Sequence, residues 1–288
     1  MSKSKVNIHR NEIADYYFQC NNAYRDAWGL DQNMQLNLGL WKKGTKNLKE
    51  ALYHLNEEVA QYAQLKKGDK VLDAGCGVGG TAIHLAKKYA CSVTGITLAT
   101  NQLKQAKENA KKEGVNELCN FQLMDYSSTD FADESFDVII GIESICYAEP
   151  KSAFLKEAHR LLKKGGRLVL AENLQAKNKL NQEEYDCLYT NAFNGCKVKS
   201  LDTKGNYLKN LNNLNFSFAH CFDYTEFIRP SIKRLRRFYY PAYLYNRWHR
   251  FIGKPFSATQ EANTKMCYYL LSSLNRGLWK YGIIKAVK

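Results

Sequence analysis

The sequence predicts a doubly wound α/β domain, and three observations carry this prediction. Between residues 70 and 172, short apolar runs alternate with helix-like segments, which is the pattern of βαβ units around a mostly parallel sheet. The run at 136–142 is rich in Val and Ile, as expected of a strand buried on both faces. A glycine-rich turn at 75–80 follows the first strand and opens a helix, so a ligand site is expected at that strand's carboxyl end.

The strands and helices of this central part follow one another along the chain. Strands are predicted at residues 70–73, 92–97, 120–124, 136–142 and 167–172. The helices between them are predicted at 79–89, 100–113 and 151–162. Gly114 ends the second helix, and a Lys-Gly-Gly turn at 164–166 leads from the third helix into the last strand.

The flanking segments extend this domain in three predicted parts. Residues 1–60 are expected to form an N-terminal helical lid, residues 61–175 a ligand-binding α/β core, and residues 176–288 an inserted helical cap with the C-terminal completion of the sheet. The cap is predicted from a polar, Asn- and Lys-rich stretch at 174–215. After it we expect a strand at 215–224, helices at 225–250 and 257–275, and a closing strand at 279–287, for seven strands in all.

Composition restricts the class of protein. With 288 residues, 45% of them hydrophobic, and four prolines, the chain is expected to be ordered almost from end to end. The N-terminus resembles no targeting peptide, and no run approaches the roughly 20 apolar residues of a membrane span. Nine cysteines without a CxxC pair indicate reduced thiols and no metal site. We therefore expect a soluble cytoplasmic protein.

The formal charge of +14 calls for an acidic partner or surface. The densest basic segment, residues 233–250, interleaves Lys and Arg with Tyr, Phe and Trp. Three interpretations stay open for it: a solvated helix face, a surface that stacks on nucleic-acid bases, and peripheral contact with an anionic membrane. No specific nucleic acid is expected as a partner, and the oligomeric state is not predicted.

The glycine turn alone fits two ligand classes. Dinucleotide sites use similar glycine spacing, with an acidic residue at the end of the second strand for the ribose. Here Asp73 precedes the turn, and the second strand ends in Gly-Ile-Thr-Leu at 95–98, with no carboxylate. The dinucleotide interpretation is therefore disfavoured.

Six segments together resemble the class I S-adenosylmethionine-dependent methyltransferases, with their Rossmann-like fold. They lie, in the family's order and spacing, at residues 71–80, 95–102, 124–126, 135–139, 142–144 and 161–166. Within that superfamily the chain is most similar to sterol, tocopherol and other small-molecule methyltransferases. It shares Thr-Leu-x-x-Asn-Gln at 97–102 with the cyclopropane fatty acid and mycolic acid synthases. The resemblance implies S-adenosyl-L-methionine as cofactor.

The resemblance also assigns roles to residues of the predicted site. Gly75, Cys76 and Gly77 would hold the methionine moiety, with Asp73 shaping the turn. Gln102, Thr97 and Leu98 would meet the ribose. Asp125 would accept from the adenine amino group, beside Tyr126, and Ile142 would complete the site. The resembled families also fold an N-terminal helix over the cofactor with an aromatic near its sulfonium, so Tyr16 and Tyr17 are candidates, although such a pair also suits a core.

Two residues after the fourth strand are predicted to be catalytic. Glu143 lies where open α/β sheets place their sites, and it is the candidate base for an acceptor proton. The alternative is a structural contact to the lid. Tyr147 follows where sterol methyltransferases more often have His, which puts a sterol acceptor in doubt.

The expected acceptor is a hydrophobic small molecule, methylated at carbon or oxygen: sterol-, prenyl-quinol- or polyketide-like. The basis is a supply of aromatic side chains in the flanking segments, namely Trp28, Trp41, Phe193, Tyr239, Tyr240 and Tyr243. One alternative is cyclopropanation of a lipid acyl chain, against which stands Ser144 after Glu143, where those enzymes have His. An RNA-binding methyltransferase is the other, but the Asn/Asp-Pro-Pro-Tyr-like motif of such enzymes is missing after the fourth strand.

Overall fold

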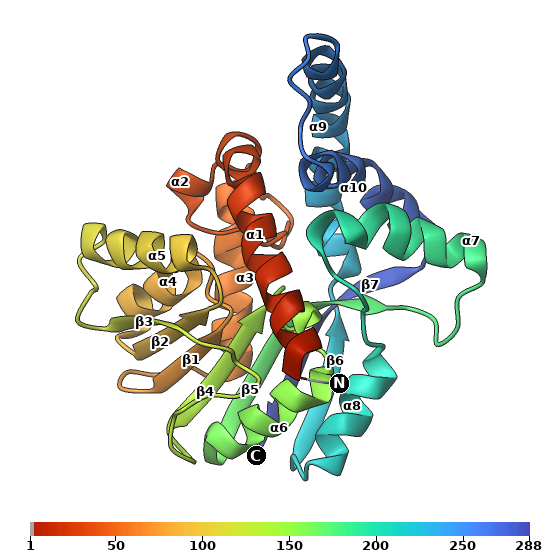
Figure 1. Ribbon diagram of the computed structural model, residues 1–288. Coiled ribbons are helices and arrows are strands. Elements are labelled where there is room, and N and C mark those ends of the chain that lie inside the picture. The colour runs from red at the N-terminus through yellow and green to blue at the C-terminus, as the bar shows by residue number, and fades with distance from the viewer. Residues whose placement is uncertain (1–2) are drawn as a thin grey trace.

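A computed structural model describes the backbone of residues 3–288 and the side chains of residues 11–288. Its centre is a seven-stranded sheet of order β3-β2-β1-β4-β5-β7-β6, in which β7 alone runs antiparallel to its neighbours (Figure 1). This confirms the predicted doubly wound, mostly parallel sheet. The strands are β1 (Lys70–Ala74), β2 (Ser92–Thr97), β3 (Cys119–Leu123), β4 (Phe136–Ile142), β5 (Leu162–Gln175), β6 (Phe218–Asp223) and β7 (Trp279–Val287).

Helices cover both faces of this sheet, and alternate residues of each strand serve the two cores. On one face α3 (Leu48–Ala63), α4 (Gly80–Tyr89) and α5 (Thr100–Lys112) pack with Val71, Val138 and their neighbours. On the other face α6 (Lys151–Leu161) and α8 (Lys204–Asn213) pack with Leu72 and Ile139. Successive side chains of a strand point to opposite faces, so the continuous apolar runs are explained by burial on both sides.

Strand β5 differs from its expected bounds. It begins at Leu162, which pairs with Phe136 of β4, and the ladder shifts register before Arg167 pairs with Val138. The predicted turn at 164–166 is therefore part of the strand. The reason lies at the other end of the chain, because Gly165 N–H donates to Lys288 O and Lys288 N–H donates to Gly166 O.

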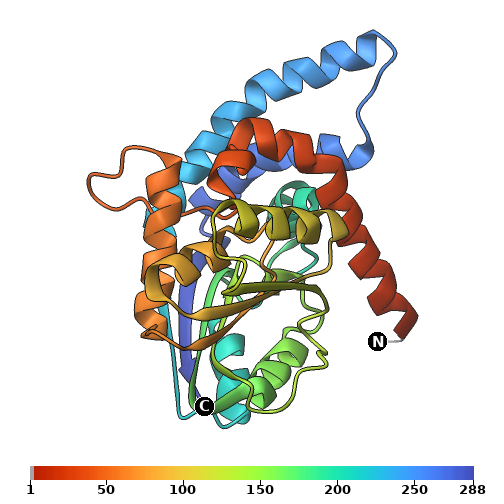
Figure 2. The ribbon, with the colours of Figure 1, turned by 90° about the vertical axis from the view of Figure 1, so that its left-hand side faces the viewer.

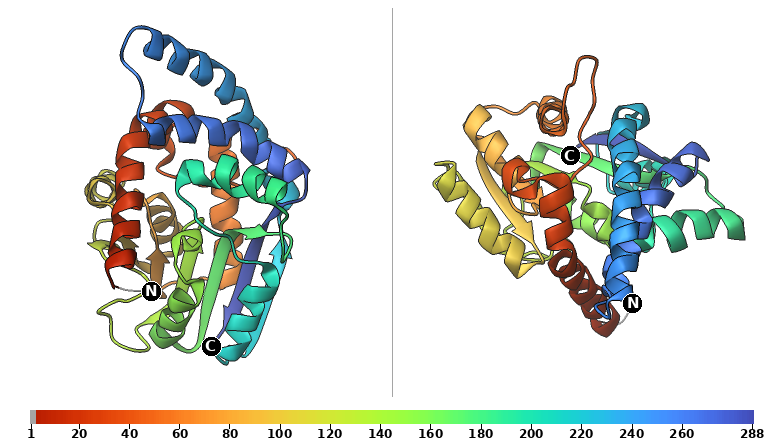
Figure 3. Two further views of the ribbon diagram at one scale, coloured as in Figure 1. Left: turned by 45° about the vertical axis from the view of Figure 1, so that its right-hand side comes forward. Right: turned by 90° about the horizontal axis from the view of Figure 1, so that it is seen from above.

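The remaining helices lie above the carboxyl ends of the parallel strands. They are α1 (Lys3–Trp28), α2 (Leu30–Asn33), η1 (Ile145–Tyr147), α7 (Gln182–Tyr185), the π-helix η2 (Asp186–Ala192), η3 (Phe193–Cys196), α9 (Thr225–Phe251) and α10 (Ala258–Asn275). Helix α1 packs against α10, and α9 pairs with α10 in a long hairpin whose far end projects beyond the rest of the molecule (Figures 2 and 3).

The division at residues 60/61 and 175/176 stays a prediction. Helix α3 crosses the first boundary while covering the sheet, and α8, placed by sequence within the cap, packs against β6 and α6. Among the described residues, no helix combines the length and apolar character needed to cross a bilayer. All nine cysteines are free thiols.

Candidate active site

A tight turn at the carboxyl end of β1 forms the floor of the site. Gly75 and Cys76 both donate their N–H groups to Ile96 O of β2, at 2.9 and 3.0 Å. Gly75, Gly77 and Gly79 have φ of 89°, 54° and 88°, values that only glycine adopts at little cost. The turn thereby enters α4 with its backbone exposed to the space above it.

The loop after α2 crosses this turn. Gly80 N–H donates to Met34 O at 3.1 Å, and a Cβ on Gly80 would meet that carbonyl at 2.1 Å. Residues 34–38 therefore lie directly over the start of α4. One cavity opens between this loop, the glycine turn and the helices above the sheet.

Most of the residues predicted for the site line this single cavity. From β1 and the glycine turn come Asp73, Gly75, Cys76 and Gly77. From the end of β2 and the start of α5 come Thr97, Leu98 and Gln102. The other lining residues among those predicted are Tyr126, Ile142, Glu143, Tyr147 and Tyr17.

Two predicted residues, Tyr16 and Asp125, are absent from the described lining. The Tyr16 hydroxyl bonds to the Tyr24 hydroxyl and accepts from Asn263 Nδ2 at 2.9 Å, so this fully buried side chain belongs to the packing of α1 on α10. Asp125 Oδ1 accepts from Ser127 N–H at 2.8 Å and shapes the turn after β3. The role of either residue toward a ligand stays a prediction.

Asp73 is a buried carboxylate that faces the cavity. The side chain is 3% exposed, and its Oδ2 has no hydrogen-bond partner among the described residues. Burial raises the pKa of Asp73 to about 7. A buried oxygen without a donor is costly, so this position suits a ligand that brings a donor or a positive charge.

Gln102, in the first turn of α5, is held by Thr97 at the end of the neighbouring strand β2. The Thr97 hydroxyl donates to Gln102 Oε1 at 3.0 Å and also accepts from Ala99 N–H. Since Oε1 is occupied, the amide N–H groups are the part of Gln102 suited to a ligand oxygen. Tyr126 lies across the cavity, where its hydroxyl donates to Ser144 O at 2.8 Å and its ring packs edge-on against Phe154.

Glu143 stands at the end of β4, with the left-handed φ of 51°. Its Oε1 accepts from Leu38 N–H at 2.8 Å and from the Tyr281 hydroxyl at 2.9 Å. Burial raises the pKa of Glu143 to about 7, although both hydrogen bonds lower it. Glu143 thus makes the predicted contact with the lid, through Leu38 N–H. It also lines the cavity, where its catalytic role stays a prediction.

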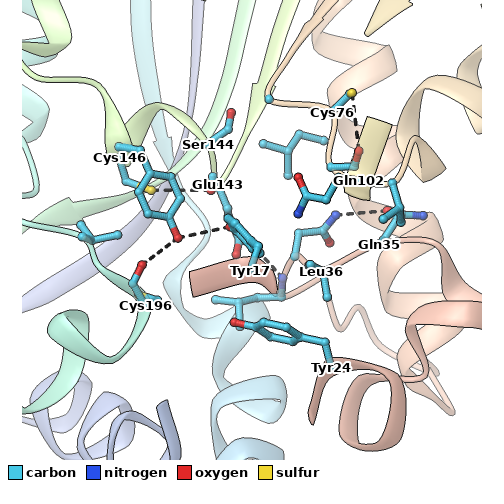
Figure 4. A pocket seen from close by; sticks show the side chains of 18 of the residues that line it. Tyr17, Tyr24, Gln35, Leu36, Cys76, Gln102, Glu143, Ser144, Cys146 and Cys196 are labelled. Atoms are coloured by element: carbon cyan, nitrogen blue, oxygen red, sulfur yellow. Dashed lines mark hydrogen bonds between the residues drawn. The ribbon is translucent and has the colours of Figure 1, made fainter. Parts of the chain in front are cut away.

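Tyr147 joins three parts of the chain. Its hydroxyl donates to Cys196 O at 2.9 Å and lies 3.2 Å from the Tyr17 hydroxyl of α1. Burial raises the pKa of Tyr147 well above its usual value, so the phenol stays protonated at neutral pH. In the close view, Tyr17 and Glu143 lie between Cys146 and Cys196 on one side and Gln102 on the other (Figure 4).

Two polar residues of β5 were missed by sequence reasoning. Glu172 is fully buried and accepts from the N–H groups of Ser144, Ile145 and Cys146, which fixes η1 below the cavity. Burial raises the pKa of Glu172 to about 8. Asn173 lines the cavity, and its Oδ1 has no partner among the described residues. A carboxylate in an otherwise apolar strand was the one available signal.

The part of the cavity under the hairpin is apolar. It is lined by Phe193 and Trp279, by Ile232 and Leu235 of α9, and by Met266 and Leu270 of α10. Trp28 also lines it, but the other aromatics predicted for an acceptor do not: Trp41 donates to Ser231 Oγ, and Tyr239, Tyr240 and Tyr243 lie farther along α9. Within the described residues, no group of His, Cys, Asp and Glu is arranged to hold a metal ion.

Comparison with known proteins adds a family to this geometry. The profile of the family described as "Mycolic acid cyclopropane synthetase" matches residues 4–214. The chain is 34% identical over 163 residues to the methyltransferase GfsG of Streptomyces halstedii, an alignment that covers 56% of this chain and 57% of that protein. It is 32% identical over 164 residues to the 27-O-demethylrifamycin SV methyltransferase of Amycolatopsis mediterranei, covering 57% of this chain and 59% of the relative.

The chain thus spans somewhat more than half the length of these curated relatives. Among solved structures, the cyclopropane synthase MmaA2 from Mycobacterium tuberculosis is similar with a TM-score of 0.81 over 97% of this chain and 98% of that one. At 16% sequence identity this likeness concerns the fold alone.

Proposed function

Because the chain belongs to the mycolic acid cyclopropane synthetase family of S-adenosylmethionine-dependent methyltransferases, we propose that it transfers a methyl group to a hydrophobic small molecule. The methylated atom is a carbon or an oxygen of a polyketide-, prenyl-quinol- or sterol-like acceptor. The similarity to the 27-O-demethylrifamycin SV methyltransferase supports the first of these.

One observation carries the proposal. A single cavity contains both the glycine turn with Asp73 and the apolar space beneath α9 and α10. A polar cofactor and an apolar acceptor therefore have adjoining places inside one enclosure. Proximity and the exclusion of water are what transfer from an activated methyl group chiefly requires.

The residues present fit S-adenosylmethionine. Asp73 offers an unsatisfied carboxylate oxygen for an ammonium, and a Cβ on Gly77 would meet no protein atom within 4 Å, so the backbone there is open to a ligand. Gln102 has amide donors that would meet the ribose, and Tyr126 would form an aromatic wall for the adenine. The bound cofactor supplies an electrophilic methyl group on a sulfonium.

Glu143 is the group suited to manage the acceptor's proton. With a pKa near 7 it can hold a proton or release it at neutral pH, as a general base requires. Its bonds from Leu38 N–H and Tyr281 fix the carboxylate in place while residues 34–38 cover the glycine turn. The bond from Leu38 thus ties the positioned base to the loop that covers the glycine turn.

Cyclopropanation of a lipid acyl chain is the second candidate, favoured by the family's description. It shares the cofactor and the apolar chamber, and it differs in needing an alkene acceptor.

The free thiols support a reducing compartment such as the cytosol.

The test uses S-adenosylmethionine labelled in the methyl group, added with fractionated organic and aqueous extracts of the cell that makes the protein. We expect label in the organic fraction, and mass spectrometry of that product identifies the acceptor atom. A Gly77→Val variant, which fills the open space at the turn, is the matched control. Label confined to aqueous products, or to RNA, would refute the hydrophobic acceptor.

A further inference from the structure

From Lys233 to its C-terminal end, α9 carries an exposed stripe of cationic and apolar side chains. Each of these residues lies three or four positions from another member of the set, which places them on one helix face. The α9 stripe consists of Lys233, Arg237, Tyr240, Leu244, Arg247, Trp248 and Phe251, all exposed.

The apolar members are exposed far beyond what is ordinary for a surface. Leu244, Trp248 and Phe251 are 66%, 55% and 89% exposed, and Ile252 beside them is 40% exposed. Single apolar residues on a surface need no explanation, but a contiguous set marks an interaction site.

The charge around the stripe has one sign. Between Glu226 and Glu261 the chain has eight Lys and Arg residues and no carboxylate. The partner must therefore offer both negative charge and an apolar interior.

Ring contacts beside the stripe hold α9 against α10 and against the loop before it. Tyr245 and His249 pack against each other and against Phe256 in the loop before α10. Arg236 lies over the Tyr268 ring of α10, with its guanidinium carbon 3.3 Å from the ring centroid. The cation of Arg250 pairs with Glu261 at 2.5 Å. Arg236 and Arg250 thus serve the hairpin, whereas Arg237 and Arg247 lie on the stripe.

We propose that the α9 stripe docks the protein on the interface of an anionic lipid bilayer. A helix face of Trp, Phe, Leu and Tyr flanked by Lys and Arg is the composition that lies at the boundary between headgroups and acyl chains. A second copy of the chain would bring like charge to the same face. A nucleic acid would leave Leu244 and Ile252 without a partner.

The position of the stripe relative to the cavity suggests that docking brings the acceptor to the active site. This part of the inference rests on the proposed function. Ile232 and Leu235, on the same helix, line the apolar part of the cavity. A bilayer held at the far end of α9 thus lies along the helix that walls the acceptor chamber. The acceptor in this reading is a molecule dissolved in the membrane.

Vesicle co-sedimentation of the full chain tests the docking without any acceptor. We expect binding to vesicles of phosphatidylcholine mixed with phosphatidylglycerol, weak binding to phosphatidylcholine alone, and release as salt is raised. Calorimetric binding of S-adenosylhomocysteine, measured on the same samples, reports on the proposed function separately, since the two results are independent.

Paired variants identify the stripe as the contact. Arg237→Gln with Arg247→Gln should lower partitioning by on the order of ten-fold or more, since each interfacial cation contributes about five-fold. The control is Lys111→Gln with Lys112→Gln at the exposed end of α5, which removes the same two positive charges away from the stripe. This control should bind vesicles almost as strongly as wild type. Phe251→Ser should also reduce binding, whereas Phe218→Ser, 47% exposed on the edge strand β6, should not.

Quenching by brominated lipid separates insertion from surface adsorption. Trp248 is the exposed member of the four tryptophans, with Trp28 and Trp279 buried. Wild-type fluorescence should be quenched by brominated anionic vesicles, and Trp248→Phe, which keeps an aromatic ring on the stripe, should lose that quenching in the vesicle-bound fraction. Three outcomes would overturn the proposal: no binding to anionic vesicles at low salt, equal binding by the stripe variants, or a stripe-dependent dimer or RNA complex without vesicle binding.

Discussion

Replacing Asp73 by Asn removes the carboxylate that the fold buries against the cavity, with two separate consequences. The first concerns stability. Burial raises the pKa of Asp73 from 3.8 to about 7, so the protonated folded form is favoured. The stability that the folded state has with Asp73 protonated is fully present below the unfolded pKa and is lost as pH rises through about 7. Roughly three pKa units correspond to about 4 kcal/mol. In the absence of cofactor, the unfolding free energy of wild type should therefore fall more steeply than that of Asp73→Asn between about pH 4 and 7.

The second consequence concerns cofactor binding, which should strengthen as pH rises, whereas stability falls. An ammonium beside Asp73 favours the ionised carboxylate, so binding must displace a proton below pH 7. The dissociation constant of S-adenosylhomocysteine for wild type should rise about ten-fold for each pH unit below 7. Above that pH, Asp73→Asn should bind about 1.5 to 3 kcal/mol more weakly, the usual contribution of a hydrogen bond to a charged group.

Isothermal titration calorimetry in two buffers of different ionisation enthalpy measures both the dissociation constant and the number of protons released on binding. Wild type should release a proton on binding near pH 6, and Asp73→Asn should release less. Glu143→Gln is the comparison, because Glu143 is a second carboxylate in the cavity with a pKa raised to about 7. If wild type and Asp73→Asn bind with the same affinity and the same proton release, Asp73 only shapes the turn.

Three further variants probe other parts of the site. A Cβ on Gly75 would lie 2.4 Å from Ser144 Cβ, at a φ of 89°. Gly75→Ala should therefore lower the unfolding free energy, measured in denaturant titrations, by roughly 2 to 5 kcal/mol. Gly77→Ala, where a Cβ would meet no protein atom within 4 Å, should lower it by only about 1 to 2 kcal/mol. Equal losses would mean that the Ser144 contact relaxes freely. Glu143→Gln keeps an oxygen for its two donors, so cofactor affinity should hold while the rate of methyl transfer falls by about 10²- to 10⁴-fold; an unchanged rate would leave only the contact with the lid. Asp125→Ala should weaken S-adenosylhomocysteine binding by about 1 to 3 kcal/mol, and an unaltered affinity would confine Asp125 to its turn.

The sheet was predictable because its signals are local. Each parallel strand is a short apolar run bounded by turn residues, and the glycine turn needs positive φ at positions that adjoin in sequence. The predicted cofactor residues from the glycine turn and the end of β2 therefore came together as expected, since the carboxyl ends of parallel strands share one edge.

Long-range polar contacts had no such signal. Leu38 and Glu143 are far apart in sequence, and no pattern connects a backbone N–H in the lid to a carboxylate after β4. Glu172 sits within an apolar strand, and its partners in η1 appear only once β4 and β5 are paired. Tyr16 and Tyr17 illustrate a finer limit: neighbours on a helix point about 100° apart, so one packs on α10 while the other lines the cavity.

The measurement that tests the central claim most directly is calorimetric titration of the full chain with S-adenosylhomocysteine and, separately, with NAD. The second strand carries no carboxylate for a dinucleotide ribose, and Asp73 with the open backbone at Gly77 suits the methionine moiety. We predict saturable binding of S-adenosylhomocysteine, lost in Gly77→Val, and no heat of binding with NAD. Tight binding of NAD with no response to S-adenosylhomocysteine or S-adenosylmethionine would contradict the account.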